Sequence, residues 1–358
     1  PVTNRLQAQL AARFEDYGGQ AGTTFDPKVS LRYRAADWIA FRGSASTTFR
    51  APPLTQRNTE VATSLQSILG SFRTIDIQGD PALKPETATT YSVGVILTPG
   101  DLRATVDFWR FDFQNPIATE PVSGLVSAVF PNGASGANNC ANPAFAALVS
   151  RFTFNGACSA ANISRLLVRN ANGSDQSLAG VDVGAEYRFR DVWNGDVALG
   201  VSLTHVSKFE VDSTEIAGIE VAPAFDGAGA LNAQTNIYPM PDLKASAFAE
   251  WSNERVSVRW TLNYIGEMED RRAGVFDPLL YRDQRNQLFT VTAGQTIKAF
   301  VTHDLAVRAE LPWETRVSLS ASNVFDKAPP FARLSLNYDP FTASSVGRVV
   351  KLAISKRY

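Results

Sequence analysis

The sequence predicts an all-β, transmembrane, antiparallel up-and-down β-barrel, and three observations support this fold class. Apolar and polar residues alternate along successive runs, short and long connections alternate between the runs, and tryptophans gather at the short connections. The runs number about twelve, an even count that single-chain membrane barrels usually have. We expect strands near residues 5–15, 28–35, 37–50, 88–98, 102–113, 176–190, 196–209, 242–251, 255–268, 297–311, 314–324 and 347–358.

The alternation is clearest between residues 181 and 190. Val181, Val183, Tyr187 and other apolar residues occupy one parity there, and Asp182, Gly184, Glu186 and Arg188 occupy the other. Successive side chains of a strand point to opposite faces, whereas a helix would distribute both sets around its circumference. Each strand therefore has one face suited to lipid and one face suited to water.

The connections between the runs are alternately very short and long. The short ones centre on Ala36-Asp37, Pro99-Gly100, Asn194-Gly195, Ser252-Asn253 and Pro312-Trp313, and the long ones span about 16–27, 51–87, 114–175, 210–241, 269–296 and 325–346. Membrane barrels have tight turns on the periplasmic side and long loops outside. The same asymmetry is therefore expected here.

Tryptophans mark the end of the sheet that carries the short turns. The indole ring favours the boundary between membrane and water, where the ring is half-buried and its N–H stays hydrated. The sequence therefore predicts a periplasmic aromatic girdle formed by Trp38, Trp193, Trp251 and Trp313.

Charged residues within the strands define the expected lumen face. A Lys or Arg on the lipid face at mid-bilayer costs about 2–4 kcal/mol. The parity opposite the aliphatic residues carries the residues that we expect to face the lumen or a plug: Arg42, Asp107, Asp182, Glu186, Arg188, Arg259, Asp304, Arg308 and Arg316. Arg110 and Asp112 break this pattern, and either a β-bulge or a position above the bilayer would explain them.

Composition excludes several other classes of protein. The 358 residues include 34 basic and 35 acidic side chains, for a net charge of −1. A nucleic-acid-binding protein usually has a cluster or stripe of Lys and Arg, and the sequence contains none. No apolar run approaches the roughly 18 residues of a membrane helix. The isolated His205 and His303, both on the apolar parity, form no metal cluster, and no nucleophile motif indicates an enzyme or a cofactor site.

The longest expected loop contains both cysteines, Cys140 and Cys158. We expect them to form a disulfide that restrains a loop with little core of its own. Residues 143–150 between them are expected to form a short helix. The loops also carry candidate ligand-facing residues, although for any single one of them packing of loop on loop is the favoured role: Phe152, Phe154, Tyr238, Met240, Phe276 and Tyr281. Residues 267–272 are expected to be a solvated strand tip.

Four segments, taken in order, resemble TonB-dependent outer-membrane receptors. Residues 49–53 (FRAPP) resemble the "FRAP" signature, and residues 79–87 (GDPALKPET) resemble the "NPxLKPE" approach to a strand, with Asp80 where Asn is usual. Residues 322–327 (SNVFDK) resemble the "NLFDK" segment before the last external loop. The terminal strand ends in Tyr358, as in the signal that the barrel-assembly machinery reads, although Lys356 replaces a common second aromatic residue.

The resemblance implies that residues 1–358 are the C-terminal portion of a larger barrel. Receptors of this family have about 22 strands closed around an N-terminal plug. The chain would then supply the last twelve or so of these strands, with the plug and the TonB-binding segment lying elsewhere in the receptor. The absence of a signal peptide agrees with this expectation, and a self-contained barrel is the alternative.

The resemblance also implies a function, a location and a set of partners. We expect a receptor in the outer membrane of a Gram-negative bacterium that imports a scarce small-molecule nutrient, most often a ferric siderophore in this family. Expected partners are the plug and remaining strands, TonB acting through the plug, the barrel-assembly machinery, and outer-membrane lipid and lipopolysaccharide. A passive porin-like channel and a barrel-anchored surface scaffold or adhesin are the alternatives.

Overall fold

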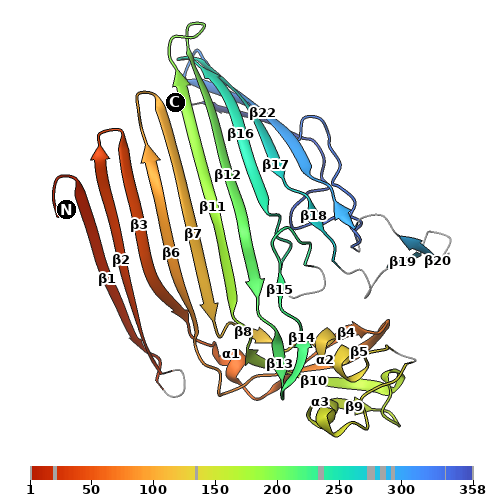
Figure 1. Cartoon of the computed structure of the whole chain (residues 1–358). Coiled ribbons are helices and arrows are strands. Elements are labelled where there is room, and N and C mark those ends of the chain that lie inside the picture. Colours follow the sequence, from red (N-terminus) through yellow and green to blue (C-terminus); the bar gives the residue numbers. More distant parts are fainter. Residues whose placement is uncertain are drawn as a thin grey trace.

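In the computed structural model, one large antiparallel sheet dominates the chain (Figure 1). The structure describes residues 2–18, 22–133, 136–232, 238–271, 279–282, 288–291, 295–334 and 336–356. The main strands are β1 (Leu6–Asp16), β2 (Thr23–Ala36), β3 (Ile39–Arg50), β6 (Glu86–Leu97), β7 (Leu102–Gln114), β11 (Gln176–Phe189), β12 (Asp196–Val211), β16 (Leu243–Ser252), β17 (Val256–Ile265), β22 (Phe300–Leu311), β23 (Thr315–Ser322) and β24 (Val349–Lys356).

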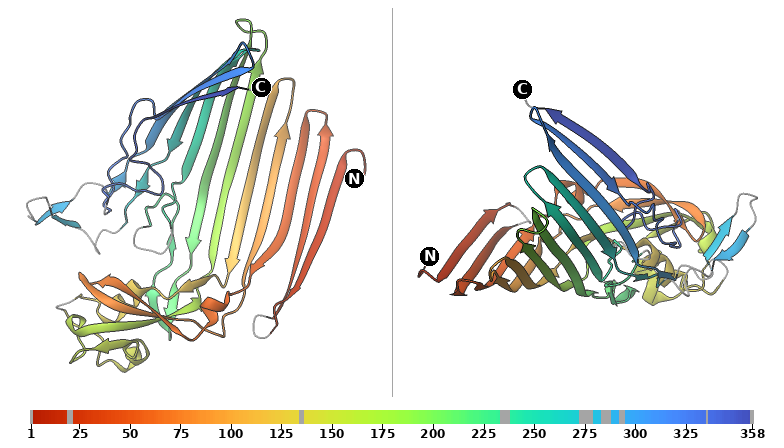
Figure 2. Two further views of the ribbon diagram at one scale, coloured as in Figure 1. Left: turned by 180° about the vertical axis from the view of Figure 1, so that it is seen from behind. Right: turned by 90° about the horizontal axis from the view of Figure 1, so that it is seen from above.

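Every main strand pairs with the next main strand along the chain, so the topology is up-and-down as predicted. The sheet curves strongly when it is viewed from above (Figure 2). Its order runs from β1 to β24, and no pairing between these two edge strands occurs among the described residues. The sheet therefore has the form of an open barrel wall.

The strand register aligns the apolar residues of neighbouring strands into rows. One such row passes from Tyr33 through Phe41, Val95 and Val106 to Val183. Because the side-chain period of a strand is two, these rows place all their members on one face. Many large apolar side chains on this face are exposed, among them Leu10, Phe25, Val93, Phe108, Leu199, Leu319 and Leu352.

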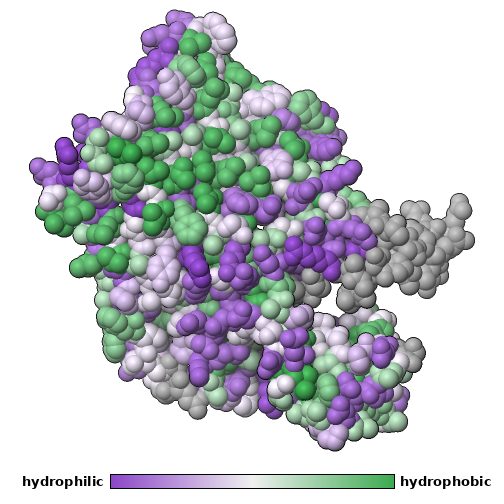
Figure 3. Space-filling model, viewed as in Figure 1, coloured by the Kyte–Doolittle hydropathy of each residue, from purple (hydrophilic) through white to green (hydrophobic). Residues whose placement is uncertain are grey.

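We call this exposed face the apolar belt. Figure 3 shows a band of hydrophobic residues across the strands, bordered by hydrophilic residues toward the loop end. A large exposed apolar surface on a soluble protein would be an aggregation hazard, whereas lipid covers it at no cost. Among the described residues, no helix combines the length and apolar character needed to cross a bilayer.

The predicted short turns all occur between the expected strands. Trp193, Asn194, Trp313 and Glu314 adopt positive φ angles of 51–61° there, and Gly100 has a φ of 59°. The expected long loop at 16–27 was wrong, because β1 and β2 extend as a hairpin through Asp16↔Thr23. The first external connection therefore has only residues 17–22.

Two long loops fold together into a compact unit that we call the loop module. Its elements are α1 (Leu54–Arg57), β4 (Val61–Ile68), β5 (Ser71–Gln78), β8 (Ile117–Thr119), α2 (Val122–Val129), η2 (Pro143–Phe145), α3 (Ala146–Val149), β9 (Phe152–Phe154), η3 (Ala160–Asn162) and β10 (Ile163–Asn172). Strand β10 pairs in parallel with β5 from the other loop. The expected short helix at 143–150 is confirmed by η2 and α3.

The loop module has its own hydrophobic core. Ile75, Leu125, Leu148 and Leu166 are fully buried in it, and Val221 joins them from β14 (Ile219–Ala222), which pairs with β13 (Thr214–Ile216). The predicted disulfide between Cys140 and Cys158 is confirmed at the edge of this core, with a Cα–Cα distance of 6.1 Å. The expectation that this loop has little core was therefore wrong.

The last external loops form a second, smaller cluster. Leu231, Met268, Ile297 and Ala332 are buried together. Nearby, Arg333 Nε donates to Asp270 Oδ2 at 2.9 Å, and both side chains are almost completely buried. The solvated tip expected at 267–272 was therefore wrong for Met268 and Asp270, whereas Glu267, Glu269 and Arg271 are exposed as expected. The remaining short strands are β15 (Phe225–Asp226), β18 (Met268–Glu269), β19 (Leu279–Arg282), β20 (Leu288–Val291) and β21 (Thr296–Ile297).

A glycine in β6 permits an ion pair to cross the strand. Arg42 on β3 and Asp107 on β7 both lie opposite Gly94 in register, and Arg42 Nε donates to Asp107 Oδ1 at 2.6 Å. A methyl group at Gly94 would overlap the Asp107 carboxylate and lie 2.8 Å from the backbone oxygen of Val106. We expect Gly94→Ala to displace this pair and to destabilise the barrel by about 1–3 kcal/mol.

The measurement is the temperature at which the complete receptor loses its folded mobility on semi-denaturing gels. Gly43→Ala is the matched control, because its new methyl group would make only ordinary contact, 3.5 Å from the backbone oxygen of Ser92. Equal transition temperatures for Gly94→Ala and the unsubstituted receptor would contradict the structural role of the crossing.

Candidate functional site

The face opposite the apolar belt carries all the charged residues that were predicted to face the lumen, and we call it the inner face. Rows of the register link Arg42, Gly94, Asp107, Asp182 and Thr204 across five strands. The other residues share this parity on their own strands: Glu186, Arg188, Arg259, Asp304, Arg308 and Arg316.

Hydrogen bonds and ion pairs hold most of these charged groups in place along the inner face. Thr204 donates to Asp182 at 2.7 Å, and Asp304 accepts from Asn263 at 2.9 Å. Arg316 pairs with Glu310 at 2.5 Å. The cross-strand partners of Arg308 are Ser257 and Ser318. The inner face therefore presents fixed groups of both signs.

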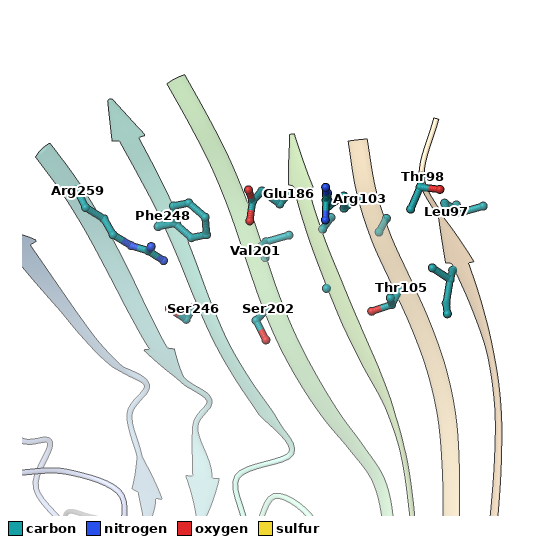
Figure 4. A pocket seen from close by; sticks show the side chains of 14 residues that line it. Leu97, Thr98, Arg103, Thr105, Glu186, Val201, Ser202, Ser246, Phe248 and Arg259 are labelled. Atoms are coloured by element: carbon teal, nitrogen blue, oxygen red, sulfur yellow. The ribbon is translucent and has the colours of Figure 1, made fainter. Parts of the chain in front are cut away.

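A shallow cavity of about 500 Å³ lies on this wall between β6 and β17 (Figure 4). Thr105, Glu186 and Ser202 line it together with Arg259, whose guanidinium lies 3.7 Å from the centre of the Phe248 ring. Such a mixture of hydroxyl, carboxylate, guanidinium and aromatic groups suits contact with a polar protein surface better than selection of one ion.

An aromatic stripe follows the charged rows toward the external end of β7. Trp109, Phe111 and Phe113 share the parity of Asp107, with ring-centre distances of 5.6 Å and 6.4 Å between neighbours. Trp109 lies against Gly180 of β11, where an added methyl group would overlap the indole ring. The sequence alone could have predicted this stripe, because Trp109, Phe111 and Phe113 alternate with Arg110 and Asp112, but only the two charged residues were singled out from it.

Those intervening charges, Arg110 and Asp112, lie on the outer face and pair with each other at 2.8 Å. The pairings of β7 show no register shift, so a bulge in β7 does not explain them. A second ion pair on β12, two strands away across β11, joins Lys208 to Glu210 at 2.6 Å and shares their face. These groups lie toward the loop end of β7 and β12.

Two of the four segments that resemble family motifs contact each other at the loop end of the sheet. Arg50, from residues 49–53, lies opposite Glu86, from residues 79–87, and their side chains pair at 2.8 Å. Glu86 also accepts from the backbone N–H of Ile117, at the start of β8, at 3.0 Å. Leu83 of the second motif is only 2% exposed. The motifs therefore connect the loop module to the barrel wall.

The segment at residues 322–327, which resembles the third family motif, forms a tight turn after β23. Asn323, with a φ of 50°, donates through its amide to Lys327 O and accepts from Lys327 N, both at 2.9 Å. Its backbone N–H donates to Asp304 at 2.8 Å. Asp326 accepts from the backbone N–H of Arg348, which closes the base of the last loop. Tyr358 lies outside the described residues.

The loop aromatics have different environments. Phe152 is 7% exposed and stacks on Phe154 with Phe130 beside both, so this pair packs within the loop module. Tyr238 is exposed and contacts Phe341, whereas Met240 forms a backbone bridge with Ala230. For Tyr281 only the strand position in β19 is described, and Phe276 lies outside the described residues.

The tryptophans and histidines occupy defined positions at the two ends of the sheet. Trp38, Trp193 and Trp313 are exposed at the short turns, whereas Trp251 donates its indole N–H to Val192 O at 3.1 Å. Toward the loop end, the rings of His303, Trp260 and Phe325 contact one another, and His205 contacts the Asp242 carbonyl. Within the described part of the chain, no group of His, Cys, Asp or Glu side chains has a metal-binding arrangement.

An open, curved β-sheet with an apolar outer face, a charged inner face and folded external loops defines the wall of a transmembrane β-barrel. The family model described as TonB dependent receptor-like, beta-barrel matches residues 1–324. The chain therefore belongs to this family, whose members are transport receptors of the Gram-negative outer membrane.

Individual relatives agree with this assignment. A probable TonB-dependent siderophore receptor, PirA of Acinetobacter baumannii, is 26% identical over 141 residues, which are 38% of this chain and 18% of that relative. Among solved structures, the ferric enterobactin receptor PfeA of Pseudomonas aeruginosa matches with a TM-score of 0.63 and 14% identity. The siderophore receptor PirA of A. baumannii matches with a TM-score of 0.61 and 14% identity. Both structural matches cover 99% of this chain but only 43% of the matched structure.

The contacts of Glu86 with Arg50 and Ile117 should stabilise the start of β8 at the loop end of the sheet. Replacing Glu86 with Ala removes the partner of Arg50 and leaves the N–H of Ile117 without its acceptor. We expect faster amide exchange in residues 117–119 and 170–172 of the complete receptor, equivalent to a local loss of about 1–3 kcal/mol. Glu60→Ala, at an exposed loop position, is the control. Unchanged exchange in Glu86→Ala would show that the motif contact does not hold β8.

The loop module should also respond to acid. Arg165 on β10 binds Asp76 on β5 at 2.6 Å, and this hydrogen-bonded guanidinium holds the pKa of Asp76 below its ordinary value, with burial partly opposing it. A lowered folded-state pKa stabilises the module above the ordinary pKa near 3.8, and this contribution disappears as the pH falls through the folded-state pKa.

The measurement is amide-exchange protection of β5 and β10 between about pH 6 and pH 3, after correction for intrinsic exchange rates. The unsubstituted receptor should lose protection relative to Asp76→Asn as the pH falls, because the variant lacks the titrating carboxylate. Parallel curves for the two proteins would refute the linkage.

Proposed function

We propose that this chain is the C-terminal barrel wall of an outer-membrane receptor that imports a ferric siderophore with energy delivered through TonB. The observation that carries the proposal is the two-sided sheet, with an apolar belt for lipid and an inner face of paired charges. Family membership supports active transport, and the relatives named as siderophore receptors support the ligand class. We propose transport, not catalysis, as its role.

The inner face suits a plug domain supplied by the rest of the receptor. Ion pairs such as Arg42–Asp107 and Arg316–Glu310 offer donors and acceptors of both signs to a polar protein surface. The edges β1 and β24 need further strands, because unpaired backbone groups are costly in lipid. In this proposal the remaining strands close the barrel, TonB acts through the plug, and the barrel-assembly machinery inserts the wall.

The outer surface suits the expected lipid partners. The apolar belt would meet the acyl chains, and the girdle tryptophans Trp38, Trp193, Trp251 and Trp313 would lie at the periplasmic boundary. The ion pairs Arg110–Asp112 and Lys208–Glu210 would then lie at the level of the lipopolysaccharide head groups. The aromatic stripe at the external end of the inner face is the surface that an incoming ligand would reach.

The test is uptake of ⁵⁵Fe complexed with a panel of siderophores by cells that carry the complete receptor as their sole siderophore transporter. We expect import of at least one siderophore, and we expect tonB deletion to abolish it. Trp109→Ala should weaken the apparent affinity for uptake by about tenfold, because stacking and burial of one indole contribute about 1–3 kcal/mol.

Phe25→Ala, an exposed position on the apolar belt, is the control and should leave uptake affinity unchanged. Import that persists without TonB, or a steady large conductance of the intact protein in planar bilayers, would instead identify a passive channel.

A further inference from the structure

A short hairpin extends from the end of barrel strand β12 into the loop module. It consists of β13 and β14, and Figure 1 shows it beside α2. Ile216, Ile219 and Val221 of this hairpin pack against the core of the loop module, and Val221 is only 7% exposed. We call residues 214–222 the clasp.

The backbone ladder is interrupted where the clasp begins. β12 pairs with β15 as far as Val211↔Phe225, and pairing resumes in the clasp at Thr214↔Ala222. Two residues on each strand separate these pairs, and one of them, Pro223, has no N–H to donate. The interruption gives the clasp a point at which it can bend relative to β12.

The base of the clasp is held by the chain that leads into the adjacent barrel strand, β11. Asp212 N donates to Asp175 O at 3.0 Å. The Ser174 hydroxyl donates to Ser213 O and lies against Thr214 Oγ1, both at 2.8 Å. Movement of the clasp is therefore confined to the part beyond this base, which carries the apolar side chains.

The sequence of the clasp is a poor one for an isolated hairpin. Glu215 and Glu220 are exposed and lie directly opposite each other, and like charges in that arrangement are destabilising. Ala217 in the turn has a φ of 53°, a conformation that Gly or Asn adopts more readily than Ala. A two-stranded hairpin is only marginally stable by itself. The folded clasp therefore depends on its contacts with the loop module.

One glycine of α2 permits the docked position. Strand β14 packs against α2, and a methyl group on Gly124 would overlap the backbone oxygen of Val221. Without that methyl group the two backbones approach closely enough for Val221 to reach the core. Glycine is a poor helix former, so the close approach accounts for its presence inside α2.

We propose that the clasp is a releasable connection between the loop module and the barrel wall, which folds as it docks on α2 and unfolds when it leaves. The core of the module stays folded after release, because neither its sheet nor its disulfide includes the clasp. Release removes the connection to the end of β12, so the module can change its position relative to the wall in one discrete step. The proposal concerns the described loops alone and holds whichever nutrient the receptor imports.

Amide hydrogen exchange of the complete receptor in nanodiscs tests the release. Gly124→Ala should displace the clasp by steric overlap, although alanine itself favours the helix. We expect exchange in residues 214–222 to accelerate by at least about tenfold, with β5 and β10 unchanged. Ser127→Ala, at an exposed position of the same helix, is the matched control and should leave exchange in the clasp unchanged.

Two substitutions should hold the clasp more tightly without altering its apolar face. Glu220→Lys places opposite charges across the two strands, and Ala217→Asn supplies a residue suited to the left-handed turn position. Each should slow exchange in residues 214–222 by about threefold, because the docked hairpin opens less often.

The distance between two spin labels tests whether the clasp positions the module. Labels at Leu65→Cys in β4 and Trp193→Cys at a short turn report the module and the wall, and both native side chains are exposed. The native cysteines are joined in the disulfide and take no label. We expect Gly124→Ala to broaden the distance distribution or to add a second distance, and Ser127→Ala to leave it unchanged.

Four results would overturn the proposal. These are unchanged exchange in the clasp of Gly124→Ala, an equal acceleration across the clasp, β5 and β10, no slowing in either tightened variant, and an unchanged distance distribution in Gly124→Ala. The second result would show that the clasp and the module open as one cooperative unit. Because no measurement uses a transported ligand, failure of the clasp is distinguishable from failure of the proposed transport function.

Discussion

The register between neighbouring strands is the constraint on which the rest of this structure depends. Apolar rows, such as the one through Tyr33, Phe41 and Val106, stay on the outer face only because the strand pairings from β2 to β7 contain no register shift beyond the first turn. A slip of one residue would turn Asp107 toward lipid and Phe108 toward the charged wall. Unpaired backbone groups are costly in a bilayer. The same strand register must therefore pair all the backbone N–H and C=O groups and also keep apolar residues on the outer face and charged residues on the inner face.

Small residues on the inner face let long side chains lie flat across the strands. Gly94 lies beneath the Arg42–Asp107 pair, Gly180 beneath Trp109, and Gly200 beneath the Phe248 ring. Without a Cβ the wall gains room for one layer of side chains parallel to its surface. The inner face can therefore be smooth although it carries many charged and aromatic groups.

The sequence was sufficient for the strands but insufficient for the external loops, and the reason is physical. Period-two alternation is a local property, so the strands, the short turns and the charged parity of residues such as Asp182 could be predicted. The loop module depends instead on distant pairing, as between Leu166 of β10 and Ile75 of β5. Asp270 was expected in solvent because its partner, Arg333, lies 63 residues further along the chain. Local periodicity carries no information about such contacts.

This dependence on distant contacts also determines how the external surface can move. The connection between β12 and β16 contributes Val221 to the core of the loop module and Leu231 to the second cluster. Glu86 joins the loop module to the wall, and Asp304 joins the turn at Asn323 to β22. Packed cores resist continuous deformation, so a ligand that displaces one loop must either move its whole cluster or break that cluster's core contacts. The external loops should therefore respond as two coupled bodies attached to a rigid sheet, and not as independent flexible segments.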